Sequence, residues 1–194
     1  TVHGLIRELE AAQPCGWVVD LRQNKGGYMW PMLAGVGPLL GEGQAGAFVD
    51  PDGQHYPWSY ADGQVSLGDA VVTAIDSALI YAPLEPLPPV AVLTSHVTAS
   101  SGELIAVAFR GRPDTRSFGT ETAGLYTANQ GFSLADGAQL SLTMARFADR
   151  TGRVYDGPIA PDEVVNAPKG LPDQVLEAAV AWLLSQPTCT GSGR

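Results

Sequence analysis

Two short segments that are apolar at almost every position limit the fold more than any other feature of the chain. They cover residues 16–21, with the sequence GWVVDL, and residues 89–94, with the sequence PVAVLT. A strand with one face in water alternates apolar and polar side chains, whereas a continuous apolar run is typical of a strand covered on both faces. Such strands occur where helices pack on both faces of a mainly parallel sheet. We therefore predict a mixed α/β fold.

Hydrophobic spacing and turn residues predict the other elements. The spacing favours helices over residues 2–13, 28–40, 69–81, 98–110 and 172–185, the second of them interrupted near Gly37 and Pro38. Strands are predicted over residues 45–50 and 117–121, and residues 54–68 show little periodicity. Asp136 and Gly137 lie between two alternating segments, which indicates a β-hairpin in the C-terminal half.

The length and charge of the chain exclude several classes of protein. Its 194 residues favour one domain, which we place at residues 1–186 with a flexible tail at 187–194. The net charge of −9 repels phosphate backbones and anionic headgroups, so we expect no nucleic-acid partner. No apolar run reaches the roughly 18 residues that a membrane-spanning helix needs. The chain starts at Thr1, which leaves room for a signal, a pro-segment or a domain upstream.

Cys15 and Cys189 are too few for a disulfide scaffold and lack the spacing of a zinc site. We expect one buried thiol and one thiol in the tail, and the sequence leaves a bridge between them open. No cluster of side chains has the spacing of metal ligands, and we expect no cofactor.

Two segments combine a strand end with residues suited to chemistry. Residues 20–27, DLRQNKGG, end in paired glycines, whose backbone N–H groups can approach a ligand closely, although a plain turn is the simpler explanation of this segment taken alone. Residues 98–103, TASSGE, lie between an apolar strand and a helix. A serine there can be a nucleophile beside an oxyanion-binding N–H group, or Ser100 or Ser101 can cap the helix with Glu103 completing a capping box.

Five segments in order resemble the C-terminal-processing (tail-specific) serine proteases, a family that includes the tricorn protease core and the interphotoreceptor retinoid-binding protein. The resemblance covers roughly residues 14–166, and the segments are DLRQNKGG (20–27), TASSGE (98–103), GTETAG (119–124), DGAQLSLT (136–143) and APDE (160–163). It implies the Clp protease/crotonase-like fold of stacked β-α-β units. It also implies that Ser100 is the nucleophile. The oxyanion hole would then comprise the N–H group of Ser101 and the N–H group of one loop glycine. Gly26 is the first choice for this glycine and Gly27 is the second.

The chain departs from the family pattern at the general base. Many members carry a lysine directly after the glycine of the third segment, but here Leu125 follows Gly124. The two lysines are Lys25, which we expect in solvent, and Lys169, near the last helix. Without that lysine, the chain is closer to the tricorn-like and retinoid-binding-like branch, in which the base is a histidine from an N-terminal segment. We expect this segment to be absent here, together with the PDZ module that many relatives contain.

Three histidines and several carboxylates remain as candidates. His96, four residues before Ser100, is a candidate base, whereas His3 and His55 are expected on the surface. Carboxylates orient the base in such sites. We expect Glu103 in a helix start, Glu121 in a loop or at the cleft, and Asp20 paired with Arg22.

These observations favour a serine peptidase that hydrolyses peptide bonds through an acyl-enzyme at Ser100. The alternative is a catalytically impaired domain of the same fold that holds an apolar ligand or a peptide. A crotonase-like acyl-CoA enzyme fits the serine segment and the glycine loop less well. The expected partner is a peptide or protein substrate, and the sequence leaves homo-oligomerisation open. The resemblance suggests a periplasmic or secreted protein, with the cytoplasm as the other option.

Overall fold

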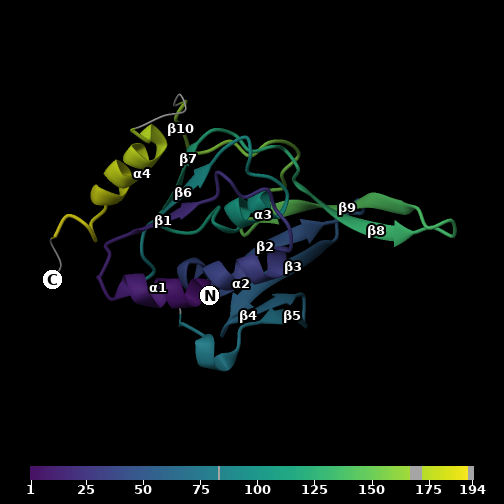
Figure 1. Ribbon diagram of the computed structural model, residues 1–194, viewed down its shortest axis with the longest axis horizontal. Coiled ribbons are helices and arrows are strands. Elements are labelled where there is room, and N and C mark those ends of the chain that lie inside the picture. The colour runs from purple at the N-terminus through teal and green to yellow at the C-terminus, as the bar shows by residue number, and fades with distance from the viewer. Residues whose placement is uncertain (83, 167–171, 192–194) are drawn as a thin grey trace.

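A parallel sheet of four strands forms one half of the molecule. The computed structural model describes residues 1–82, 84–166 and 172–191. The strands are β1 (Trp17–Asp20), β6 (Val90–Thr94), β7 (Thr115–Gly119) and β10 (Glu163–Val164), in that order across the sheet (Figure 1). Val18 of β1 pairs with Ala91 of β6, and Leu93 of β6 pairs with Phe118 of β7. The predicted parallel strands are confirmed, since the two apolar runs are neighbours in this sheet.

Helices cover both faces of the parallel sheet. Val90 and Val92 of β6 pack in one core with α2 (Met29–Leu40) and α3 (Ser101–Ala108). Ala91 and Leu93, which alternate with them, pack on the other face against α4 (Gln174–Leu184). This arrangement explains why β6 is apolar at successive positions. Within the described residues, no helix is long and apolar enough to cross a membrane.

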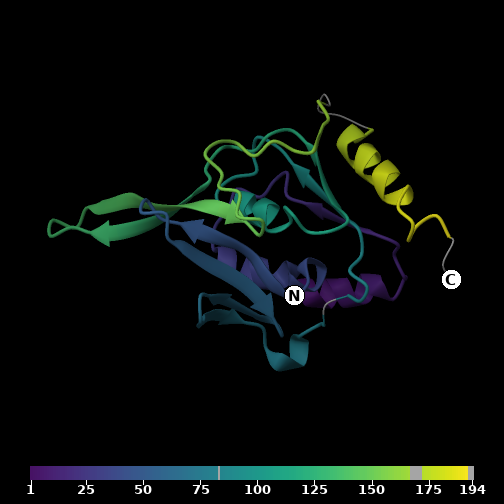
Figure 2. The ribbon, with the colours of Figure 1, turned by 180° about the vertical axis from the view of Figure 1, so that it is seen from behind.

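The second sheet has six antiparallel strands. Their order is β5 (Ala70–Ala74), β4 (Gln64–Leu67), β3 (His55–Ala61), β2 (Gly43–Val49), β9 (Gln139–Asp149) and β8 (Thr127–Ser133). β8 and β9 form the predicted hairpin, which extends beyond the rest of the molecule in both views (Figures 1 and 2). The mixed α/β architecture expected from the sequence is therefore confirmed.

The prediction of a helix over residues 69–81 is wrong. This segment forms β5 and then the 3₁₀ helix η1 (Ser77–Leu79), because Val71, Val72 and Thr73 are β-branched and favour a strand. Residues 54–68, which showed little periodicity, form β3 and β4. Asp62 and Gly63 connect these strands, both with positive φ (48° and 74°), as a two-residue hairpin turn requires.

The predicted interruption of α2 is also wrong, and the reason involves His3. Pro38 has no N–H group to donate to the carbonyl group of Ala34, one turn earlier. His3 of α1 (Val2–Glu10) replaces this donor, because its Nε2 lies 2.9 Å from Ala34 O. Its Nδ1 accepts a hydrogen bond of 2.9 Å from the N–H group of Tyr81. His3 is therefore fully buried rather than on the surface as predicted, and both ring nitrogens are used.

The expectation of two separate thiols is wrong, because Cys15 and Cys189 form a disulfide with their Cα atoms 4.9 Å apart. Cys15 lies just before β1 and Cys189 shortly after α4. The Thr188 hydroxyl also donates a 3.0 Å hydrogen bond to Cys15 O. The bridge joins residues 174 positions apart, and cysteines so widely separated carry no spacing pattern that predicts a pairing.

Candidate active site

Ser100 lies at the junction between β6 and α3 in an unusual backbone conformation. It is the N-cap residue of α3, with φ 53° and ψ −121°. A positive φ costs a residue other than glycine of the order of 1–3 kcal/mol and persists only where the surroundings enforce it. A strained strand-to-helix turn of this kind is typical of the position of a nucleophilic serine. The helix-capping interpretation also holds in part, since the Ser100 N–H group donates a 2.8 Å hydrogen bond to Glu103 Oε2.

The glycine loop, residues 20–27, lies directly against this turn. A Cβ atom placed on Gly26 would lie 2.8 Å from both Ala99 O and Ser100 Cβ, and Gly26 has φ 95°. Only glycine fits there, because any side chain would collide with the turn. The Ala99 N–H group donates a 3.0 Å hydrogen bond to Asn24 O, and Ser101 Oγ donates one of 2.6 Å to Gly27 O. The fold thus brings together the two segments that the sequence singled out.

The backbone N–H groups beside Ser100 differ in their availability. The Gly26 N–H group donates a 3.0 Å hydrogen bond to the side-chain oxygen Asn24 Oδ1. Within the described residues, the N–H groups of Gly27 and Ser101 have no hydrogen-bond partner. Two such donors on adjacent segments can bind an anionic oxygen.

Glu103 connects the Ser100 turn to the segment at residues 122–125. Its carboxylate is fully buried. Besides the Ser100 N–H group, it accepts hydrogen bonds from Thr122 Oγ1 at 2.5 Å, Gly124 N at 2.9 Å and Leu125 N at 2.7 Å. Four donors offset the cost of burying the charge. We predicted Glu103 as a helix-start residue, which is confirmed, but its role in joining the two segments was missed.

The candidate bases that the structure describes form no hydrogen bond with Ser100. His96 is exposed in the turn after β6, and within the described residues neither a histidine nor a lysine is hydrogen-bonded to Ser100. His55 and Lys25 are exposed, as predicted, and Glu121 is exposed as well. Lys169 lies outside the described residues.

Comparison with known proteins identifies the family. A model of peptidase family S41 matches residues 1–165. The chain belongs to peptidase family S41. The resemblance to tail-specific serine proteases is thereby confirmed, and the five segments that indicated it all lie within the matched residues.

Several relatives support this assignment. The S41 chain is 36% identical over 172 residues to the nisin-resistance protein of Lactococcus lactis subsp. lactis, covering 88% of this chain and 50% of that protein. A lipoprotein from Streptococcus agalactiae is similar with TM-score 0.70 and 30% identity, over 95% of this chain and 61% of that one. The photosystem II D1 C-terminal processing protease is similar with TM-score 0.65 and 26% identity, over 96% and 43%. The S41 chain spans about half the length of the curated relative it matches.

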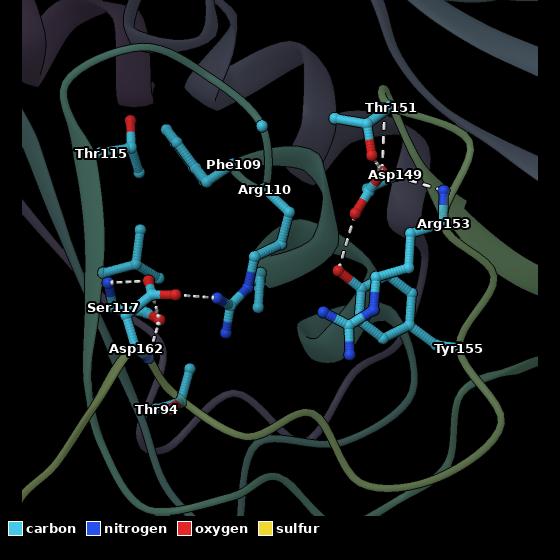
Figure 3. Close-up of a pocket in the computed structure, with 13 residues that line it drawn as sticks. Thr94, Phe109, Arg110, Thr115, Ser117, Asp149, Thr151, Arg153, Tyr155 and Asp162 are labelled. Carbon is cyan, nitrogen blue, oxygen red and sulfur yellow. Dashed lines mark hydrogen bonds and ion pairs between the residues drawn. The ribbon is translucent and has the colours of Figure 1, made fainter.

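A polar cavity of about 240 Å³ lies at the C-terminal end of α3, where Phe109 and Arg110 line it (Figure 3). On one side, Arg110 forms an ion pair with Asp162, which also accepts a hydrogen bond of 2.7 Å from Ser117 Oγ. On the other side, Asp149 accepts hydrogen bonds from the Tyr155 hydroxyl at 2.9 Å and from Thr151 Oγ1 at 2.6 Å. The carboxylates that line this cavity are thus already paired. Among the described residues, no group of three His, Cys, Asp or Glu could hold a metal ion.

Acid should weaken the fold through these two aspartates. Burial raises the pKa of Asp149 and Asp162, but their hydrogen bonds outweigh it, so the pKa of each carboxyl lies below its usual value. A lowered pKa in the folded state stabilises the fold above the unfolded pKa of about 4, and this stability is lost as the pH falls through the folded pKa. We expect the free energy of unfolding, measured with urea, to decrease from pH 5 downwards.

The variant Asp149→Asn isolates one of these contributions. It should show a shallower decrease, because the residue no longer titrates. The change Asp69→Asn, at an exposed position before β5, serves as the control and should leave the slope unaltered. An equal slope in wild type and Asp149→Asn would contradict the assignment.

Proposed function

We propose that residues 1–186 form the catalytic core of a serine peptidase in which Ser100 is the nucleophile. The observation that carries the proposal is the strained Ser100 turn, together with the N–H groups of Gly27 and Ser101 on adjacent segments, which have no partner in the part of the chain that the structure describes. In this proposal Ser100 Oγ attacks the carbonyl carbon of a peptide bond, the C–N bond breaks, and the hydroxyl proton leaves with the amine product. Water then hydrolyses the resulting acyl-enzyme, which releases the carboxylic acid and restores the Ser100 hydroxyl. Membership of the S41 family supports it.

The geometry favours Gly27 over Gly26 as the second oxyanion donor. The Gly26 N–H group is already bonded to Asn24 Oδ1, whereas the Gly27 N–H group has no partner among the described residues. The carbonyl group of Gly27 accepts from Ser101 Oγ, which fixes the orientation of this peptide relative to α3. Donors that are held in place before the reaction stabilise the developing negative charge without reorganisation.

The substrate and compartment are part of the proposal. An S41 peptidase acts on peptides or proteins, and because a relative is named a nisin-resistance protein, nisin is the first substrate to test. We propose an extracytoplasmic location, since the Cys15–Cys189 disulfide persists in oxidising compartments. A similar structure is a lipoprotein, which agrees with this location.

A catalytically impaired binding domain is the second candidate. The observation that favours it is that no described histidine or lysine is hydrogen-bonded to Ser100. A serine hydroxyl without a base is a weak nucleophile. In that case the site would hold a peptide without cleaving it.

A fluorophosphonate probe distinguishes the two functions. The probe forms a covalent adduct with an activated serine, and mass spectrometry of a digest locates it. We expect one adduct per chain on the peptide that contains Ser100, together with cleavage of a peptide substrate. An unlabelled protein that binds a peptide without cleaving it would support the binding domain, and an adduct on Ser101 would contradict the proposed nucleophile.

A further inference from the structure

The C-terminal helix α4 is attached to the ends of strand β1 at two points. At one end, the disulfide joins Cys189, after α4, to Cys15, before β1. At the other end, Asp173, the N-cap residue of α4, is bonded to Arg22, just after β1. Between these points α4 packs on the outer face of the parallel sheet, beside β6 and β7 (Figure 1). The S41 model ends at residue 165, so α4 lies outside the part that it matches.

Arg22 connects α4 to the start of the glycine loop. Its Nη1 atom lies 2.8 Å from both carboxylate oxygens of Asp173. Its Nε and Nη2 atoms donate to the two oxygens of Asp20, at 2.9 and 2.6 Å. The Arg22–Asp20 pair was predicted from the sequence, whereas the contact with Asp173, 151 residues away, was not. The planar guanidinium group can hold two carboxylates in a fixed geometry.

The backbone of Arg22 leads directly to the candidate oxyanion donors. Ser95 Oγ donates a 2.7 Å hydrogen bond to Arg22 O. Two residues later, Asn24 accepts hydrogen bonds from the N–H groups of Ala99 and Gly26. The side chain of Arg22 is only 23% exposed, although it belongs to a loop. Among the described cations, Arg22 is the one paired with the cap of α4. A shift of Arg22 would therefore move the loop that carries Gly27.

We infer that Asp173 is a positioning residue: through Arg22 it holds the glycine loop so that the Gly27 N–H group stays beside the Ser101 N–H group. The inference rests on the proposed serine peptidase function. Displacement of a catalytic donor by about 1 Å can reduce the rate about 100-fold. We expect loss of the Asp173 carboxylate to slow labelling of Ser100 by about 10- to 100-fold, with little effect on substrate binding.

Two substitutions separate this role from helix capping. Asp173→Ser keeps a good N-cap but loses the carboxylate, whereas Asp173→Glu keeps a carboxylate but is a poor N-cap. A positioning role predicts that the labelling rate decreases from wild type to Asp173→Glu to Asp173→Ser, while the melting temperature of Asp173→Ser exceeds that of Asp173→Glu. The control is Asp76→Ser, at the N-cap of η1, where the aspartate accepts from Ala78 N. It should not alter labelling. Labelling rates that follow the melting temperatures would overturn the inference.

Amide hydrogen exchange tests the same contact without catalysis. The N–H groups of Asn24, Gly26 and Ala99 are hydrogen-bonded within the loop and turn. They should exchange at least about 10-fold faster in Asp173→Ser than in Asp76→Ser, because local opening becomes easier. An unlabelled wild type would refute the proposed function alone, and unchanged exchange would refute the positioning role.

Discussion

Replacing Ser100 by alanine should reduce peptide hydrolysis by at least about 1000-fold and abolish fluorophosphonate labelling, because the attacking oxygen is lost. The oxyanion donors are backbone groups and remain in place, so peptide binding should change little. Hydrolysis of a fluorogenic peptide, with KM and kcat measured separately, checks this result.

The control for this variant is Ser101→Ala, at the adjacent position. It loses the hydrogen bond from Ser101 Oγ to Gly27 O but keeps the N–H group of residue 101. We expect it to be labelled, with a rate reduced far less than in Ser100→Ala. A Ser100→Ala protein that retains wild-type hydrolysis would exclude Ser100 as the nucleophile.

The strained backbone conformation at Ser100 should also lower the free energy of unfolding. Its φ of 53° is unfavourable for serine and for alanine alike, but glycine adopts it freely. Ser100→Gly should therefore be more stable than Ser100→Ala by about 1 kcal/mol, as measured by thermal unfolding. An active site commonly retains such strain at the expense of stability.

Replacing Glu103 by glutamine should have the largest effect on stability of the substitutions considered. The neutral amide offers one oxygen and one NH₂ group in place of two oxygens. If the amide oxygen accepts the hydrogen bonds from the N–H groups of Ser100 and Leu125, the NH₂ group takes the place of the other carboxylate oxygen. The N–H group of Gly124 then faces a donor and has lost its acceptor. One unpaired buried donor together with the loss of charge-assisted hydrogen bonds should lower the free energy of unfolding by about 3 kcal/mol.

The matched control is Glu177→Gln, since Glu177 occupies the first turn of α4 but is exposed. It should change the free energy of unfolding by less than about 0.5 kcal/mol. Urea denaturation of the three proteins measures the difference. Equal stability of Glu103→Gln and wild type would show that the four hydrogen bonds to Glu103 contribute little.

Local patterns in the sequence predicted the elements that depend on burial or on a turn. The runs at β1 and β6 are apolar because both of their faces are covered, and the hairpin of β8 and β9 follows from Asp136 and Gly137. The same Asp-Gly pair occurs at residues 62 and 63, between β3 and β4, and was missed. The aromatic residues of β3 at positions 56, 58 and 60 alternate and could have revealed this strand.

The candidate site was predictable only as far as its parts are local. The Ser100 turn and the glycine loop each have a recognisable sequence, and their contact followed from the family resemblance. The role of His3 depends on Pro38, and that of Arg22 depends on Asp173. Such pairings arise when distant segments pack together. No periodic pattern of residues in the sequence indicates them.

The disulfide between Cys15 and Cys189 has a mechanical consequence. When a chain is pulled through residues outside this bridge, the force passes along the covalent bond between the two cysteines. The sheets, the Ser100 turn and the glycine loop all lie within the bridged segment, so tension on the ends does not reach them. Of the helices and strands that the structure describes, only α1, which precedes Cys15, lies in the path of the force. Once the bridge is reduced, the same tension acts on α4 and β1 and can separate the helix from the strand.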